Sequence, residues 1–233
     1  MSSETRANTV STTSNAASGM APSGVPSKPR LRGWLHAVAA PIALAAGLVL
    51  VVLTQTVPGR AAAAVYTVGL LILFGNSALY HTGPWDDRTR AIFRKLDHSN
   101  IFIFIAATYT PLTVQLLSGQ SRTTLLIVIW ACAVAGVLAR VLWMSAPRWL
   151  YTALYIAMGW VAVWWLPDMV RAGGWWVVGL LIVGGVIYTA GAIVYALKRP
   201  NPVPRWYGFH EIFHSCTILA AICHYIAIWL ATF

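Results

Sequence analysis

Charged side chains are scarce in this sequence of 233 residues: only 9% are Asp, Glu, Lys or Arg, whereas 58% are hydrophobic. Soluble domains carry roughly 25% charged residues, so a chain of this composition cannot cover a water-facing surface. The sequence therefore indicates a membrane protein. Its net charge of +10 is typical of cations that orient helices in a bilayer and meet anionic headgroups. A nucleic-acid partner is excluded, because that reading needs a soluble basic face.

Cysteine is scarce as well. The three cysteines, Cys132, Cys216 and Cys223, lie within apolar segments and form no CxxC pair. This pattern argues against a redox motif or a structural zinc site, and favours small buried packing residues.

Large apolar side chains are nearly absent from residues 1–28, where we expect a disordered N-terminal tail because too little surface can be buried for folding. Residues 29–233 are expected to form one all-α domain, a seven-transmembrane-helix bundle. Its helices are predicted from seven apolar runs near the roughly 20 residues that cross a bilayer: 34–54, 61–81, 98–117, 123–143, 150–166, 174–197 and 209–231. Polar and turn-forming residues separate the runs, and the longest such break is the expected loop 82–97.

The distribution of Lys and Arg predicts the orientation of the spans. If the N-terminus lies in the cytoplasm, all but three of the 16 basic residues fall on the cytoplasmic side. Only Arg60, Arg122 and Arg171 fall on the other side. This asymmetry follows the positive-inside rule and predicts an N-terminus inside and a C-terminus outside. We expect the protein to reside in the plasma membrane.

Ionisable side chains within a membrane protein are costly and usually mark a working site. Residues four apart share one face of a helix, which pairs His210 with His214 and Ser77 with His81. The predicted topology places both pairs, together with Asp97, at one depth near the cytoplasmic face.

Three neutral imidazoles with one open position are typical of a catalytic zinc site. We therefore predict that His81, His210 and His214 bind Zn²⁺, with water as the fourth ligand. Asp97 would orient that water or accept its proton, and Ser77 would hydrogen-bond the water or a developing oxyanion. Alternatively, these side chains bond to one another as polar contacts between helices, without a metal. Spacing alone favours neither reading.

Four other ionisable residues are weaker candidates. Glu211 points about 100° around the helix from His210, so we expect a solvated or headgroup-level carboxylate. His98 is expected to cap its helix or face the interface, and His224, about 15 Å deeper than His214, to be a core histidine. His36 is open, either beside the site or at the interface.

Several short motifs carry a family resemblance. They are Asn76-Ser77-Ala78-Leu79-Tyr80-His81, Lys95-Leu96-Asp97-His98-Ser99, Ala107-Thr108-Tyr109-Thr110-Pro111 and Phe209-His210-Glu211-Ile212-Phe213-His214. Together they resemble the hemolysin III family, which belongs with the progestin and adiponectin receptors and is distantly similar to alkaline ceramidases. The likeness covers about residues 32–233. It implies seven spans, an inside N-terminus, and a zinc ion at His81, His210 and His214 with Ser77 and Asp97 near its water. Relatives often carry an acidic or amide residue ahead of the first-span histidine, whereas Arg32-Gly33-Trp34-Leu35 precedes His36 here, which leaves the role of the first span in question.

Three functions fit these predictions. The first is an intramembrane zinc-dependent hydrolase that acts on an amide or ester bond of a membrane lipid. The second is a receptor-like or membrane-homeostasis protein in which the zinc is structural. The third is a cytolytic, pore-forming hemolysin, for which the sequence offers little support because no polar stripe runs through several spans. The oligomeric state and the identity of the lipid lie beyond the sequence.

Overall fold

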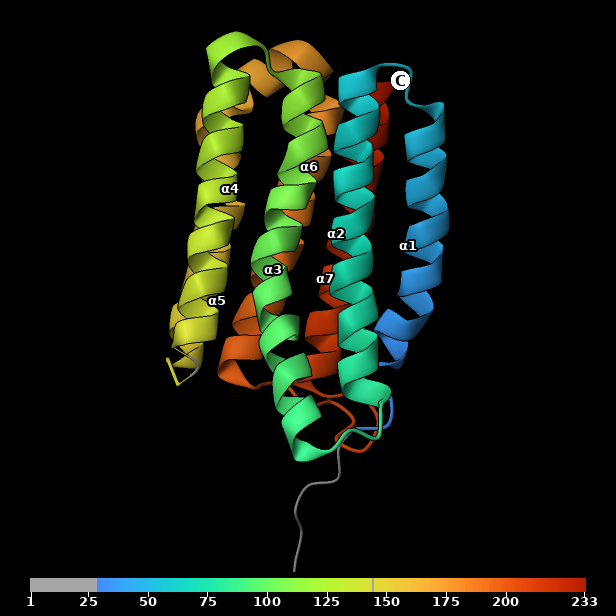
Figure 1. Ribbon diagram of the computed structural model, residues 1–233, viewed down its shortest axis with the longest axis vertical. Coiled ribbons are helices and arrows are strands. Elements are labelled where there is room, and N and C mark those ends of the chain that lie inside the picture. Colours follow the sequence, from blue (N-terminus) through green and yellow to red (C-terminus); the bar gives the residue numbers. More distant parts are fainter. Residues whose placement is uncertain (1–28, 144) are drawn as a thin grey trace, which may run out of the picture.

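The computed structural model describes residues 29–143 and 145–233, and in these ranges the chain is built from helices. The predicted tail, 1–28, lies outside the described residues. The elements are α1 (Trp34–Leu53), α2 (Val57–Thr82), α3 (Asp87–Leu116), α4 (Gly119–Leu142), α5 (Arg148–Gly159), the 3₁₀ helix η1 (Val161–Trp165), α6 (Leu166–Leu197) and α7 (Phe209–Thr232). Successive helices run in alternating directions, so that α1 begins at one end of the bundle and the C-terminus lies at the other (Figure 1).

The bundle has the exterior of a membrane protein. Six helical stretches are long and apolar enough to cross a bilayer, the stretch Arg148–Leu197 counting as one. Large apolar side chains such as Ile42 and Trp164 point outward with exposures of 63% and 81%. Because such side chains would be unfavourable in water, they indicate a lipid-facing surface. The protein is a polytopic helical membrane protein.

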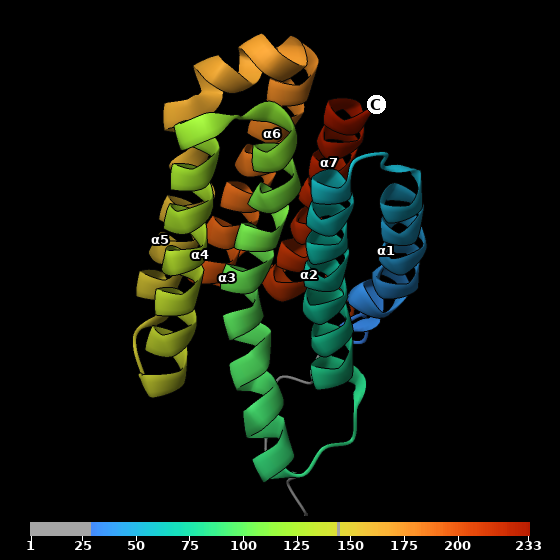
Figure 2. The ribbon, with the colours of Figure 1, turned by 45° about the horizontal axis from the view of Figure 1, so that its top comes forward.

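The fifth and sixth apolar runs are joined more closely than the sequence suggests. The expected span 150–166 is the twelve-residue helix α5 followed by η1. α6 begins at Leu166 and turns sharply at Gly174, where φ is 77° and ψ is 176°. The segment around this turn arches over one end of the bundle (Figure 2). Glycine suits this position because a side chain would clash at positive φ.

The prediction of a polar loop over residues 82–97 is wrong. α3 begins at Asp87, and the Asp86 side chain caps it by accepting hydrogen bonds from the backbone N–H and the hydroxyl of Thr89. These bonds favour the ionised carboxylate and lower the pKa of Asp86. Hydropathy missed the first turns of α3 because they are polar, although Arg, Lys and Ile are acceptable helix formers there. Asp97 therefore lies well inside a helix rather than at its start.

α3 is the central helix, and it contacts α2, α4, α5, α6 and α7. Its buried face carries aromatic residues such as Phe102 and Phe104, which are 2% and 3% exposed. Glycines let α6 approach α7 closely. A Cβ built on Gly191 would lie 2.6 Å from Cys216 Cβ, and one on Gly184 would lie 2.4 Å from the His224 ring.

Candidate metal centre

Two helices supply the three clustered histidines. Ser77 and His81 lie one turn apart on the last turns of α2, and both are buried. His210 and His214 lie one turn apart on the first turns of α7, so their imidazoles share the face that meets α2. The structure thus brings His81 together with His210 and His214, although His81 and His210 are 129 positions apart in the sequence.

The imidazole nitrogens are spaced for one metal ion. His210 Nε2 lies 3.1 Å from His81 Nε2, and one ring nitrogen from each of the three histidines falls within 4.8 Å of the others. Zinc–nitrogen bonds of about 2.0–2.1 Å in a tetrahedron place ligand nitrogens about 3.3 Å apart. Nδ1 of His214 is also buried without a hydrogen-bond partner, which leaves that nitrogen available to a ligand. The residues fit a metal ion.

Asp97 and Ser77 lie beside the histidine cluster. Asp97 Oδ2 is 4.0 Å from His81 Nε2, and Ser77 lines the same cavity as Asp97. The carboxylate comes from α3, so three helices converge here. Its oxygen is too far from the imidazole for a direct hydrogen bond, but a small molecule held by the histidines would be within its reach.

The first helix also takes part in the cluster. His36, 2% exposed, stacks on the His214 ring with centroids 3.9 Å apart and an interplanar angle of 14°. The sequence left this residue open because an apolar run shows only that a histidine is near the membrane, not what it faces. Gly33 allows the start of α1 to lie close to the end of α2. Its φ is 86°, and a Cβ built on it would lie 2.6 Å from His81 Cβ.

Glu211 is not the solvated carboxylate that its helical position predicted. It is fully buried, accepts a hydrogen bond of 2.6 Å from Arg32 Nε, and caps α7 by accepting one of 2.9 Å from Gly208 N–H. The sequence signal was the motif Gly-x-x-Glu at the start of α7, a capping pattern. Its partner lies 179 positions earlier, which no local pattern reveals. This ion pair ties the start of α1 to the start of α7, directly beside the histidines.

The other two histidines lie apart from the cluster. His98 bonds through Nδ1 to the Arg94 carbonyl, at 2.7 Å, and through Nε2 to the Tyr195 hydroxyl, at 3.1 Å. His224 Nε2 lies 3.3 Å from the Leu181 carbonyl, so it binds α6 deeper in the bundle. Both engage neighbouring helices rather than the candidate ligands.

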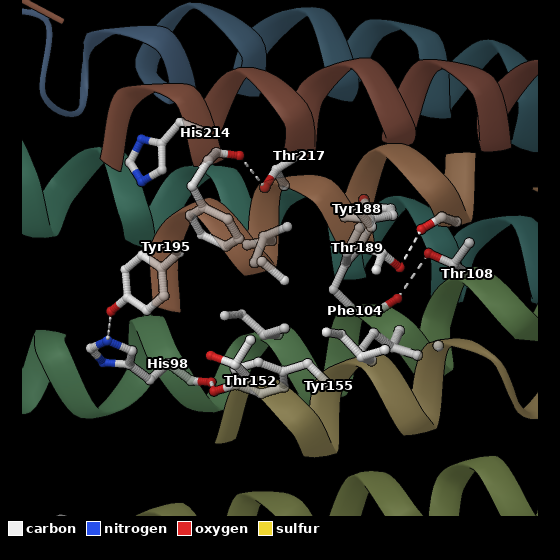
Figure 3. A pocket seen from close by; sticks show the side chains of 18 of the residues that line it. His98, Phe104, Thr108, Thr152, Tyr155, Tyr188, Thr189, Tyr195, His214 and Thr217 are labelled. Atoms are coloured by element: carbon white, nitrogen blue, oxygen red, sulfur yellow. Dashed lines mark hydrogen bonds between the residues drawn. The ribbon is translucent and has the colours of Figure 1, made fainter. Parts of the chain in front are cut away.

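A mostly apolar cavity of about 120 Å³ extends from the cluster into the bundle. Asp97, Ser77 and His214 line one end, and Phe104, Tyr188 and His224 line the deeper part. Figure 3 shows the cavity between α7 and α6 on one side and α3 and α5 on the other, with His214 and Tyr188 toward opposite ends. Its walls suit an apolar chain whose polar end lies against the histidines.

The helical bundle and its buried histidines define a class of polytopic membrane protein with a three-histidine centre. Comparison with known proteins specifies the family. The family model described as "Haemolysin-III related" matches residues 25–225, and the chain belongs to this family. It is 32% identical over 154 residues to a Hemolysin-3 homolog of Bacillus subtilis, covering 65% of this chain and 68% of that one.

Further relatives come from both bacteria and eukaryotes. Hemolysin-3 of Bacillus cereus is 31% identical over 70% of this chain and 76% of its own. Monocyte to macrophage differentiation factor of Homo sapiens is 28% identical over 71% of this chain and 68% of its own. The adiponectin receptor protein of Drosophila melanogaster is 28% identical over 69% of this chain and 40% of its own.

Proposed function

We propose that this protein is a seven-span plasma-membrane hydrolase, with a cytoplasmic N-terminus, that uses zinc to cleave an amide or ester bond of a membrane lipid. The observation that carries the proposal is the convergence of His81, His210 and His214 with Asp97 at the mouth of an apolar cavity. A metal that only holds helices together needs no adjoining cavity and no carboxylate beside it. The Lys and Arg asymmetry supports the orientation.

The side chains have separate tasks in this reaction. A zinc ion held by the three histidines would activate a water molecule and polarise the carbonyl of the bond to be cleaved. Asp97 is placed to accept the proton of the attacking water and return it to the leaving group. The Ser77 hydroxyl holds Asp97 or donates to the developing oxyanion. The apolar cavity holds the acyl chain and excludes bulk water.

Stacking between His36 and His214, and the pair of Arg32 with Glu211, orient the centre. Groups behind metal ligands commonly change affinity by 10–100-fold when they are removed. The first helix is therefore part of the proposed site, and Arg32 at its start supplies the partner of Glu211.

The metal is tested by elemental analysis of the purified, full-length protein. We expect about one zinc per chain and at least a tenfold loss in the variant His210→Ala/His214→Ala. His224→Ala is the matched control, because it removes an imidazole from the same helix, outside the cluster. Zinc that stays substoichiometric in wild type, or is unchanged in the double variant, would reject the metal centre.

The reaction is tested with labelled acyl amides and acyl esters in reconstituted vesicles. We expect Asp97→Asn to lower kcat by about 10²–10⁴-fold, the range for loss of a general acid or base, while the variant keeps its zinc. Equal fatty-acid release from wild-type and Asp97→Asn vesicles would refute hydrolysis.

A second candidate is a receptor-like protein with structural zinc. The convergence of His81 and His210 from different helices favours it, because a metal ion held by both imidazoles would also hold α2 and α7 together. The name of the Drosophila relative, adiponectin receptor protein, agrees with it. Zinc at one per chain with no fatty-acid release from any lipid tested would favour this function.

The name hemolysin of other relatives suggests a pore. Dye leakage from vesicles that persists after zinc removal would favour a pore-forming function.

A further inference from the structure

A second cavity, of about 590 Å³, lies at the same end of the bundle as the histidines, and its lining is basic. We call it the arginine vestibule. Arginines from four parts of the chain line it: Arg32, Arg90, Arg94, Arg140 and Arg148. Among the described residues that line it, Asp97 is the only acid.

Two of these arginines are held in place by aromatic rings. Arg140 Cζ lies 4.6 Å from the centroid of the Tyr151 ring, and Arg148 Cζ lies 4.6 Å from that of Tyr195. Arg140 is only 8% exposed. Charge that merely orients helices needs no such placement, because the positive-inside rule counts residues near the membrane surface. Burial of an arginine is costly, so the buried position of Arg140 indicates a role.

Most of this charge is not neutralised by the protein. Within the described ranges, Arg32 pairs with Glu211, whereas Arg90, Arg94 and Arg148 have no carboxylate within 4.0 Å. Guanidinium groups bind phosphate through paired N–H donors in a fixed plane, with more directional specificity than an ammonium group. Three arginines that line one cavity without a carboxylate partner, Arg90, Arg94 and Arg148, are therefore suited to a phosphate.

The vestibule joins the apolar cavity. The two share six lining residues, Asp97, His98, Thr152, Tyr155, Tyr195 and His210. A basic compartment on one side and an apolar one on the other match the two parts of an amphiphile. Asp97 and His210 lie at the junction, where the headgroup of such a molecule meets its chain.

We propose that the arginine vestibule binds the phosphate of an anionic lipid headgroup, while the part of the acyl chain nearest the headgroup occupies the adjoining cavity. Applied to catalysis, this rests on the proposed function and gives its substrate class: an acyl lipid that carries a phosphate near the bond to be cleaved. The binding itself requires no catalysis, and it can be measured in its absence.

The test is a fluorescence binding assay on the full-length Asp97→Asn variant in detergent. The probes are a labelled lysophosphatidic acid and the lysophosphatidylcholine of the same chain length, whose phosphate is masked by choline. We expect at least a tenfold preference for the first. Arg90→Gln/Arg94→Gln should remove this preference, because each lost charge-assisted contact weakens binding by about tenfold or more.

The matched control is Arg122→Gln/Arg171→Gln, which removes the same charge from the opposite end of the bundle and should leave the preference intact. Thermal unfolding shows whether each variant is folded. Substitution of the exposed Arg90 and Arg94 disturbs folding less than substitution of the buried Arg140 would.

Inorganic phosphate is the competitor that separates a lipid headgroup from free phosphate as the source of the bound group. Displacement of the lipid only at phosphate concentrations far above the lipid's Kd supports a headgroup site, whereas displacement near that Kd indicates a site for free phosphate.

Equal affinity for the two lipids, or an equal loss in both arginine double variants, would overturn the inference. These results are independent of the hydrolase test. A protein that hydrolyses lipids without preference for a phosphate would overturn the vestibule proposal alone. A protein that binds the anionic lipid without cleaving any lipid would overturn the hydrolase alone.

Discussion

The buried ion pair between Arg32 and Glu211 makes a quantitative prediction about stability. Glu211 is fully buried and has two partners, the Arg32 guanidinium at 2.6 Å and the Gly208 N–H at 2.9 Å. Arg32→Met removes the charge and keeps most of the aliphatic stem. The carboxylate then stays buried with one neutral donor, a situation that costs about 3–5 kcal/mol.

Because the Arg32 side chain is 20% exposed, solvent screens part of the interaction, and we expect a loss of about 3 kcal/mol, the lower end of that range. For a chain of this length, this corresponds to a fall in Tm of roughly 6–12 °C. Thermal unfolding in detergent, followed by the fluorescence of the 12 tryptophans, measures the shift.

A double-mutant cycle separates this ion pair from unrelated damage. Glu211→Gln removes the opposite charge, and we expect the double variant Arg32→Met/Glu211→Gln to be more stable than the sum of the single changes predicts. Strictly additive losses, or a Tm unchanged in Arg32→Met, would refute the reasoning that the carboxylate depends on Arg32.

Three further changes probe the packing around the centre. Gly33→Ala should lower both Tm and zinc content, because the new methyl group would clash with His81 and strain the positive φ; unchanged values would show that α1 can shift without cost. Gly191→Ala should destabilise the protein by about 1–3 kcal/mol through overpacking. The control Gly179→Ala, in the same helix, should be neutral or slightly stabilising in thermal unfolding, because no atom lies within 4 Å of a Cβ built there. Equal effects of the two substitutions would contradict close packing of α6 on α7. His36→Ala should weaken zinc binding by about tenfold in a chelator competition, while His36→Phe, which keeps the stacked ring, should retain it; identical losses would assign His36 a role other than stacking.

Local patterns determined much of this protein. Apolar length identified the helices, and the bounds of α7 agree with the predicted run almost residue for residue, since both rest on hydropathy between turn residues. Spacing placed His210 with His214 and Ser77 with His81 on common faces, because helical geometry is a local property. The same reasoning failed where a helix continues through polar residues, as in the first turns of α3, since hydropathy measures lipid exposure and not helical structure.

The tertiary structure alone decided which faces meet. Glu211 is buried rather than solvated because Arg32, distant in sequence, folds back onto it. His36 stacks on His214 because Gly33 lets α1 approach α2, and neither residue carries a motif that indicates this contact. The arginines that the sequence presents only as an orientation signal line a cavity that adjoins the histidines. Long-range contacts of this kind depend on how helices pack, which hydropathy and spacing within single segments do not encode.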